Sequence, residues 1–226
     1  MRKELTMKKA AIFHTSTGTL AMMQTLAKEI MPDVEIMHIV EDSMIREVMK
    51  NGGPTPNVNA RIAAYIECAN LAGCQIFMTA CSSIGGSVEQ CQFVSNIPVM
   101  RIDEAMAVEA ISSGKKIAVL ATVETTLKPT LEFINRKAVE MGKTIDVQSM
   151  LMAEAFTAFL AGNLETHDSI VSAGVMEAVK KECDIIVLAQ ASMSRALEKL
   201  GTLPVPVLTS PERGIKLLKV RVDQLQ

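Results

Sequence analysis

The sequence is poor in aromatic and charged residues. Of its 226 residues 3% are aromatic, with one tyrosine and no tryptophan, and 21% are charged, giving a formal net charge of −2. A nucleic-acid-binding protein usually has a basic face and stacking rings, so this composition excludes nucleic acid as a partner. No run of about 18 uncharged apolar residues occurs, so we expect no transmembrane helix and no membrane partner.

We also expect neither a secretory signal in these residues nor a disulfide framework. The apolar stretch after Lys9 is broken at His14, which makes it too short for a signal core. The five cysteines are an odd number, scattered through an apolar sequence of ordinary size. This usage is typical of reduced thiols, so we expect a cytoplasmic protein.

Motifs for the common cofactors are absent. There is no CxxC pair, and the three histidines lack metal-ligand spacing, so we expect no metal site. No GxGxxG fingerprint follows a strand candidate and no P-loop occurs, so neither a dinucleotide nor ATP is indicated. The sequence therefore predicts no cofactor.

What the sequence does contain is a regular alternation of short apolar runs with longer amphipathic segments. Several runs, such as 117–121, are apolar without period-two alternation, which is typical of parallel strands covered by helices on both faces. The alternation predicts an α/β doubly wound fold. The amphipathic helix candidates include 60–72, 125–141, 153–160 and 169–182. The strand candidates are 9–15, 34–39, 75–80, 99–102, 116–122, 146–150, 184–189 and 205–209.

The chain also matches itself at a distance of about half its length. Segments 11–17, 76–82 and 97–100 are similar in character to 117–123, 186–192 and 205–208. We therefore predict two pseudo-symmetric, doubly wound halves, each with a four-stranded parallel sheet flanked by helices. Because ligands of open parallel sheets bind outside the carboxyl ends of the strands, two facing halves would surround one shared cleft.

Small hydroxylated residues follow the predicted strands. Hydroxyls and free backbone N–H groups at helix starts can bind a carboxylate or phosphate, although helix capping alone explains each loop equally well. The candidate substrate-binding residues of this kind are Ser16, Thr17, Ser82, Ser83, Thr122, Thr125 and Ser192.

Cys81 is the candidate catalytic residue. It follows a buried-type strand, and the dipole of a helix starting there would favour a thiolate. His14 ends the first strand and is a further candidate for substrate binding, although a hydrogen-bonded core histidine is an equally good interpretation. Asn57 and Arg61 follow a loop rich in glycine and proline that could close over a site, and Arg61 could pair with a carboxylate.

The remaining chemically active side chains are interpreted as structural. The four other cysteines lie within or beside predicted helices, or before a strand at the end away from the cleft. We also assign a structural role to two histidines, His38 and His167.

The segment Thr79-Ala80-Cys81-Ser82-Ser83, with its matched segment one half-length later, resembles the aspartate/glutamate/hydantoin racemase superfamily. The resemblance covers essentially the whole chain. It implies that the C-terminal helix returns to the first half, so that residues 1–103 and 211–226 form one half and 104–210 the other, with the active site in the cleft between them. It also implies a homo-oligomer.

The same resemblance implies cofactor-independent chemistry. One cysteine from each half would act as acid and base on opposite faces of the α-carbon of a small carboxylic or amino acid. The sequence departs from this pattern because the residue aligned with Cys81 is Ala191, where the second cysteine would stand. Three explanations remain open: an engineered change, a natural one-thiol enzyme, or replacement of the missing group by Ser192, Glu124 or His14.

The leading prediction is a racemase-like isomerase of amino-acid metabolism in which Cys81 moves the α-proton. One alternative is a one-cysteine decarboxylase or lyase of the same superfamily. The other is a non-catalytic protein that binds a small carboxylate.

Overall fold

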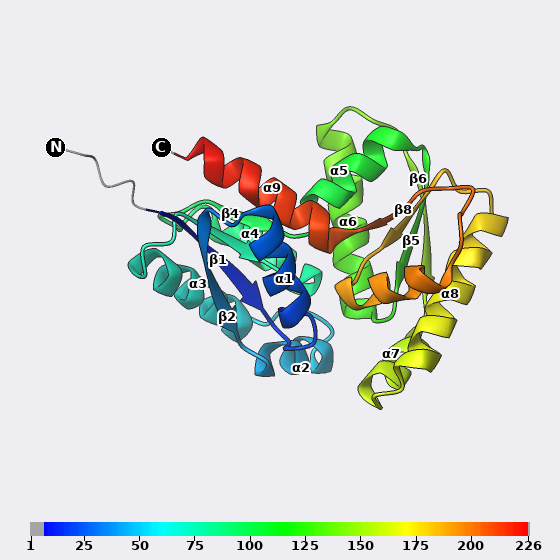
Figure 1. Cartoon of the computed structure of the whole chain (residues 1–226), viewed down its shortest axis with the longest axis horizontal. Coiled ribbons are helices and arrows are strands. Elements are labelled where there is room, and N and C mark those ends of the chain that lie inside the picture. The colour runs from blue at the N-terminus through cyan, green and yellow to red at the C-terminus, as the bar shows by residue number, and fades with distance from the viewer. Residues whose placement is uncertain (1–6, 226) are drawn as a thin grey trace. The chain divides into compact units, whose positions relative to one another are not determined.

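A computed structural model describes residues 7–225, which fold into two compact α/β units (Figure 1). Unit 1 contains the chain up to Ile102 together with the segment from Gly214 onward, and unit 2 contains Asp103–Arg213. Each unit has a four-stranded, all-parallel sheet flanked by helices. The predicted fold class is therefore confirmed.

The sheet of unit 1 has the strand order β2-β1-β3-β4. Its strands are β1 (Lys8–His14), β2 (Val34–Val40), β3 (Ile76–Thr79) and β4 (Val99–Arg101). Its helices are α1 (Leu20–Ile30), α2 (Ser43–Lys50), α3 (Pro56–Leu71), the 3₁₀ helix η1 (Ser82–Ile84), α4 (Gly85–Cys91) and the larger part of α9 (Ser210–Gln224). The central strands β1 and β3 are almost wholly buried, because helices cover both faces of the sheet.

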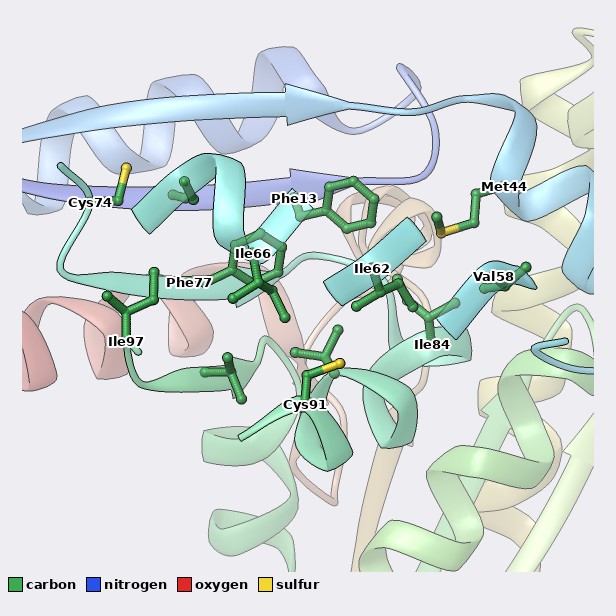
Figure 2. Close-up of a cluster of buried hydrophobic side chains, with 14 of the residues drawn as sticks. Phe13, Met44, Val58, Ile62, Ile66, Cys74, Phe77, Ile84, Cys91 and Ile97 are labelled. Atoms are coloured by element: carbon green, nitrogen blue, oxygen red, sulfur yellow. The ribbon is translucent and has the colours of Figure 1, made fainter. Parts of the chain in front are cut away.

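Alternate residues of the central strands form two separate hydrophobic cores in unit 1. Phe13 and Phe77 point to one face, where their ring centroids lie 5.7 Å apart and helices α3 and α4 cover them (Figure 2). Ile12 points to the other face and packs in one cluster with Met23 of α1 and Leu218 of α9. The last helix therefore completes the core of the first unit.

The sheet of unit 2 repeats this topology with the order β6-β5-β7-β8. Its strands are β5 (Lys116–Ala121), β6 (Asp146–Leu151), β7 (Ile185–Leu188) and β8 (Val207–Thr209). Its helices are α5 (Glu104–Ser113), α6 (Glu124–Glu140), α7 (Ala153–Leu160), α8 (Leu164–Lys180) and the 3₁₀ helix η2 (Ala191–Lys199). One core packs the sheet against α5 and α6, and the other packs it against α8 and η2.

All eight predicted strands are present, with ends within two residues of the prediction. Two helices begin earlier than their apolar pattern indicated. Helix α3 starts at Pro56 because Thr55 accepts a hydrogen bond from the backbone N–H of Val58, a side-chain cap that suits proline at the first helical position. Helix α8 starts at Leu164 for a similar reason, because Oδ1 of Asn163 accepts a hydrogen bond from the backbone N–H of Thr166.

The state of the cysteines and the length and polarity of the helices also bear on the expectations from the sequence. All five cysteines are free thiols. Among residues 7–225 the helices are too short or too polar for any of them to span a bilayer.

Gly214 allows α9 to approach the end of β4 closely. A Cβ atom at this position would lie 2.6 Å from the backbone oxygen of Ile102, which cannot move aside as a flexible side chain would. We expect Gly214→Ala to lower the free energy of unfolding by about 1–3 kcal/mol, measured by urea titration.

Gly86→Ala is the matched control, because a Cβ atom there meets no atom within 4 Å and the residue lies in helix α4. This variant should be as stable as the wild type or gain up to about 1 kcal/mol. If both variants behave alike, the close approach at Gly214 contributes nothing to stability.

Candidate active site

Cys81 lies at the carboxyl end of the unit 1 sheet, directly after β3. Its backbone is extended, with φ −127° and ψ 111°, and the next residue starts η1, which leads into α4. Its backbone N–H donates to Oγ1 of Thr79 at 3.2 Å. The free thiol is half-buried against the core around Phe13 and Phe77. The structure thus holds one thiol in a fixed strand-to-helix junction that remains partly open.

The two serines that follow Cys81 are buried. Ser82 and Ser83 form the first two residues of η1, where the backbone N–H of Ile84 donates to the carbonyl oxygen of Cys81 at 3.4 Å. Both predicted binding residues therefore lie beside the thiol along the chain, with little of their surface exposed.

His14, the last residue of β1, is buried and forms a pair with the half-buried His38 of β2. Nε2 of His14 lies 3.0 Å from Nδ1 of His38, and only 1% of His14 is exposed. Sequence reasoning missed this partnership and treated His38 as structural. The two histidines are brought together by the strand register, in which Ile12 pairs with His38. Because His14 lies two residues after Ile12, both histidines point to the same face of the sheet.

Both histidines are held neutral. Burial, and to a smaller extent the neighbouring His38, together lower the pKa of His14 to about 4. Burial also lowers the pKa of His38. Among residues 7–225, Nδ1 of His14 has no hydrogen-bond partner although it is buried. The pair therefore offers a neutral imidazole with one unused ring nitrogen at the carboxyl end of β1.

The other candidates in unit 1 are exposed. Ser16 and Thr17 lie in the loop before α1, where Oγ of Ser16 accepts from the backbone N–H of Gly18 at 3.1 Å. The residue before α1 is Thr19, which makes no side-chain cap, so helix capping does not explain these hydroxyls. Asn57 is exposed in the first turn of α3.

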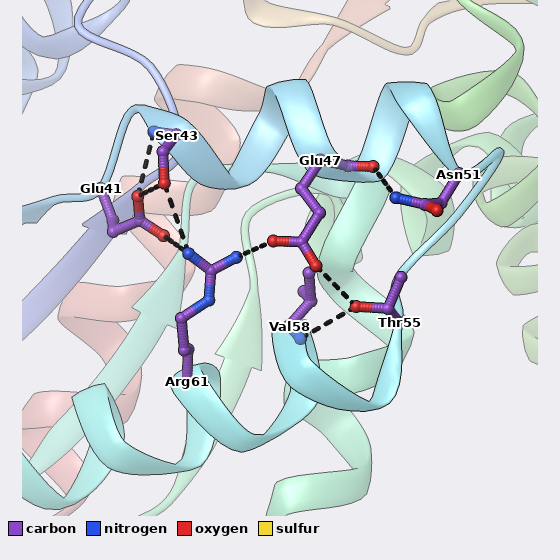
Figure 3. A network of polar contacts seen from close by, with 7 residues as sticks. All are labelled: Glu41, Ser43, Glu47, Asn51, Thr55, Val58 and Arg61. Atoms are coloured by element: carbon purple, nitrogen blue, oxygen red, sulfur yellow. Dashed lines mark hydrogen bonds and ion pairs between the residues drawn. The ribbon is translucent and has the colours of Figure 1, made fainter.

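Arg61 is bound within unit 1 rather than left open to a ligand. Its guanidinium donates to Oε2 of Glu41 at 2.9 Å and to Oε2 of Glu47 (Figure 3). Thr55 donates to the other oxygen of Glu47 at 2.8 Å, so the network joins α2 to the start of α3. Arg61 thus pairs with two carboxylates of the protein itself, which accounts for its place on α3, and its pairing with a substrate carboxylate stays a prediction.

In unit 2 the predicted residue Thr122 is linked to Gln190. Oε1 of Gln190 accepts from the backbone N–H of Thr122 at 2.6 Å and from its Oγ1 at 3.0 Å. Oγ1 of Thr125 is buried without a hydrogen-bond partner among the described residues. Ser192 is half-buried in η2. Sequence reasoning did not single out Gln190.

The backbone register shows that Gln190, not Ala191, occupies in unit 2 the place of Cys81. In unit 1, β1 and β3 align Phe13 with Thr79, and the N–H of Ala80 donates to Phe13 at 2.8 Å. In unit 2, β5 and β7 align Leu120 with Leu188, and the N–H of Ala189 donates to Leu120 at 2.9 Å. The next residue is Cys81 in one unit and Gln190 in the other, and each directly precedes a 3₁₀ helix.

The assignment of Ala191 to the missing cysteine is therefore corrected by one residue. Ala191 is the first residue of η2 and corresponds to Ser82, the first residue of η1. Apolar similarity between residues 76–82 and 186–192 supported an offset of 110, whereas the hydrogen bonds require 109. The residue that stands in place of a second thiol is thus an amide.

Metal-ligand clusters are not found in the part of the chain that the structure describes. No group of three or more His, Cys, Asp or Glu side chains converges within residues 7–225. The His14–His38 pair alone supplies too few ligands for a structural zinc site, which takes four.

The lowered pKa of His14 makes acid destabilise the protein. In the unfolded chain the imidazole takes up a proton near pH 6.5, whereas in the folded protein it does so only near pH 4. The contribution of His14 to the free energy of unfolding is therefore complete above pH 6.5. It is lost as the pH falls towards 4. The expected loss is at most roughly 3 kcal/mol.

Urea titrations across this pH range test the expectation. His14→Gln should show a flatter dependence of unfolding free energy on pH, because one titrating group with a shifted pKa is gone. Ser16→Ala, an exposed neighbour, should keep the wild-type dependence. An unchanged slope in His14→Gln would show that the pair does not govern acid stability.

The Arg61 network makes a separate prediction about stability. Arg61→Gln leaves the partly buried Glu41 and Glu47 without their shared cation, so we expect a loss of about 1–3 kcal/mol in the free energy of unfolding. Arg46→Gln is the control, because its ion pair with Asp42 is 3.8 Å long and exposed, and should change stability by less than about 0.5 kcal/mol. Equal effects in urea titrations would contradict the role of the network.

Comparisons with known proteins agree with this architecture. The fold is similar to that of an aspartate racemase homologue from Pyrococcus horikoshii, with a TM-score of 0.72 and 18% identity over 96% of this chain and 100% of the other. It is also similar to an aspartate racemase from Picrophilus torridus, with a TM-score of 0.74 and 15% identity over 96% and 94% of the two chains.

A third similar structure is the glutamate racemase isoform RacE1 from Bacillus anthracis, with a TM-score of 0.69 and 16% identity over 96% and 82% of the chains. No curated protein matches the sequence. At these identities the structures establish the fold, whereas the family model described as Asp/Glu/Hydantoin racemase matches residues 13–218 of the sequence itself. On that match, the chain belongs to the Asp/Glu/hydantoin racemase family.

Proposed function

We propose that the protein is an enzyme that moves a proton at the α-carbon of a small carboxylic or amino acid, with Cys81 as the acid and base and without a cofactor. The observation that carries the proposal is the free, half-buried thiol at the end of β3, in a chain of the racemase family. Ser16, Thr17, Ser82, Ser83, Thr122, Thr125, Ser192, His14 and Asn57 are the proposed substrate-binding residues.

The chemistry explains why a thiol and several hydrogen-bond donors are needed together. When the α-proton leaves, its electron pair moves onto the carboxylate and forms an enediolate-like species. Donors already placed around those oxygens stabilise the developing charge. A thiolate that takes the proton must lie within hydrogen-bond reach of it, so the α-carbon of the substrate is proposed to bind beside Cys81.

His14 supports this chemistry in a neutral state. Its lowered pKa keeps the ring uncharged near pH 7, so it would contribute a hydrogen bond rather than a charge. The ring nitrogen not bound to His38 is the atom proposed to face the substrate.

A one-cysteine decarboxylase or lyase is the second candidate, and Gln190 favours it. A carboxamide does not exchange protons as an acid or base near neutral pH. With one thiol, a proton can be delivered or removed on one face of the α-carbon, which is sufficient to protonate a carbanion after loss of CO₂. Cys81 has the same role in both candidates.

The cytoplasmic location, the homo-oligomer and the small-carboxylate substrate remain predictions. The location follows from the reduced cysteines and the oligomer from the family resemblance. The third possibility, a protein that binds a carboxylate without turnover, is an outcome of the experiment below.

Exchange of the α-proton in deuterated water tests the proposal. The wild type is incubated with D- and L-aspartate, glutamate and alanine, and with methylmalonate, and ¹H NMR follows loss of the α-proton or of CO₂. We expect turnover of at least one acid, and Cys81→Ser should reduce its rate at least about 100-fold because it removes the acid–base group.

Cys68→Ser is the matched control, because Cys68 is also a free thiol but lies exposed on α3. It should retain the wild-type rate, and circular dichroism should show that both variants are folded. Wild-type exchange in Cys81→Ser would refute the assignment of the thiol. Binding of the acids by calorimetry without turnover would identify a binding protein instead.

A further inference from the structure

Arg101 is a buried cation beside the turn that carries Cys81. It is the last residue of β4, where the strand register pairs it with Thr79 of β3, and only 2% of its surface is exposed. Thr79 is also the residue whose Oγ1 accepts the backbone N–H of Cys81 at 3.2 Å. Because paired residues of neighbouring strands point to the same face of a sheet, the Arg101 side chain starts next to the residue that anchors the thiol.

The guanidinium of Arg101 lies against Gly85, the first residue of α4. A Cβ atom added to this glycine would lie 2.5 Å from both Cζ and Nε of Arg101 and 2.9 Å from Nη2. The backbone of Gly85 is ordinary right-handed helix, with φ −55° and ψ −44°, so its conformation does not require glycine. The missing side chain instead leaves the space that the guanidinium fills.

The turn between β3 and α4 is closed by its own backbone. The N–H of Ile84 donates to the carbonyl oxygen of Cys81 at 3.4 Å. The N–H of Gly85 donates to the carbonyl oxygen of Ser82. Thr79 thus holds the first residue of the turn and the guanidinium contacts the last. Because these hydrogen bonds join its two ends, a displacement of Gly85 would also move Cys81.

Glu89 of α4 holds the guanidinium in this position. Nη1 of Arg101 donates to Oε2 of Glu89 at 3.2 Å, while Nη2 lies on the side of Gly85. The carboxylate compensates a charge that would be costly to bury alone. An ion pair that only attached α4 to β4 would not require glycine at position 85. The contact with Gly85 is therefore what links this ion pair to the turn that carries the thiol.

We propose that Arg101 is the positioning residue of Cys81, and that its guanidinium, held by Glu89 and packed on Gly85, fixes the turn from which the thiolate reaches the α-proton. The inference rests on the proposed function, and every contact that carries it lies within unit 1. Arg101 acts through Cys81 rather than on the substrate. Its loss should therefore slow proton transfer more than it weakens binding of the acid, because a displaced thiol no longer meets the proton in the right geometry.

Arg101→Met tests the assignment in the kinetics of α-proton exchange, with the acid from the panel that the wild type turns over fastest. Methionine keeps an apolar stem but has no guanidinium to pack on Gly85. We expect kcat to fall roughly 10- to 100-fold while KM changes less than about 2-fold. Arg101→Lys should not restore kcat, because a compact ammonium on a flexible stem does not reproduce the planar guanidinium.

Arg136→Met is the matched control. The ion pair of Arg136 with Glu140 has the same length of 3.2 Å but is exposed on α6, so this variant should keep the wild-type kcat. A lower melting temperature of Arg101→Met without a change in kcat would show a structural role only and would overturn the inference.

Gly85→Ala tests the same contact from the other side. Its new Cβ atom would displace the guanidinium, so kcat should fall roughly 10-fold, whereas Gly86→Ala should keep it because no atom lies within 4 Å of that position. In an Arg101→Ala background the three atoms nearest to the new Cβ are gone. Gly85→Ala should then change kcat by less than about 2-fold. Two substitutions whose effects simply multiply would contradict a route through this contact.

Amide hydrogen exchange followed by mass spectrometry examines the turn without a substrate. In Arg101→Met the amides of residues 81–85 should exchange at least about 5-fold faster than in the wild type, whereas those of β5 should be unchanged. If the wild type turns over no acid, the proposed function fails, while a faster-exchanging turn still supports the contact. If the wild type is active and Cys81→Ser is not, but Arg101→Met keeps both kcat and the amide exchange rates, the proposed function stands and the role of Arg101 is refuted.

Discussion

The parallel pairing of the two central strands in each unit is the constraint on which the rest of the structure depends. Backbone hydrogen bonds between β1 and β3, and between β5 and β7, decide which residue leaves each sheet first and in which direction its side chain starts. A shift of one residue would send Cys81 to the opposite face, because side chains alternate along a strand. The apolar cores on both faces oppose such a shift, since every buried residue would change sides.

Strong regular patterns made much of the architecture predictable from the sequence. Runs such as Ile185–Leu188 are apolar at every position, which is typical of a strand covered on both faces, and several of the eight strands were located in this way. Cys81 was found for a related reason, because a thiol directly after such a run must lie at the carboxyl end of the sheet. Helix starts were less accurate, since caps at Thr55 and Asn163 lie before the apolar pattern begins.

Contacts between distant residues were beyond sequence reasoning. Similar apolar residues fill positions 76–82 and 186–192, so their hydropathy could not fix the offset to a single residue, and the equivalent of Cys81 was placed at Ala191 instead of Gln190. The partner of His14 depended on the register of β2 against β1. The role of Arg61 was ambiguous for a similar reason, because an arginine after a loop rich in glycine and proline can bind either a ligand or a carboxylate of the protein. In the structure it pairs with Glu41 and Glu47.

The return of α9 to unit 1 has a consequence for how the chain folds as it is made. Ile215, Leu218 and Val222 are fully buried in the same core as Ile12 and Met78, so the residues that begin this core and those that finish it are separated by the whole of unit 2. During synthesis unit 2 can fold around its own sheet while one face of the β1–β3 layer is covered by α1 but not yet by α9. The apolar surface that α9 later covers is then exposed in the nascent protein, where it favours aggregation or binding by a chaperone.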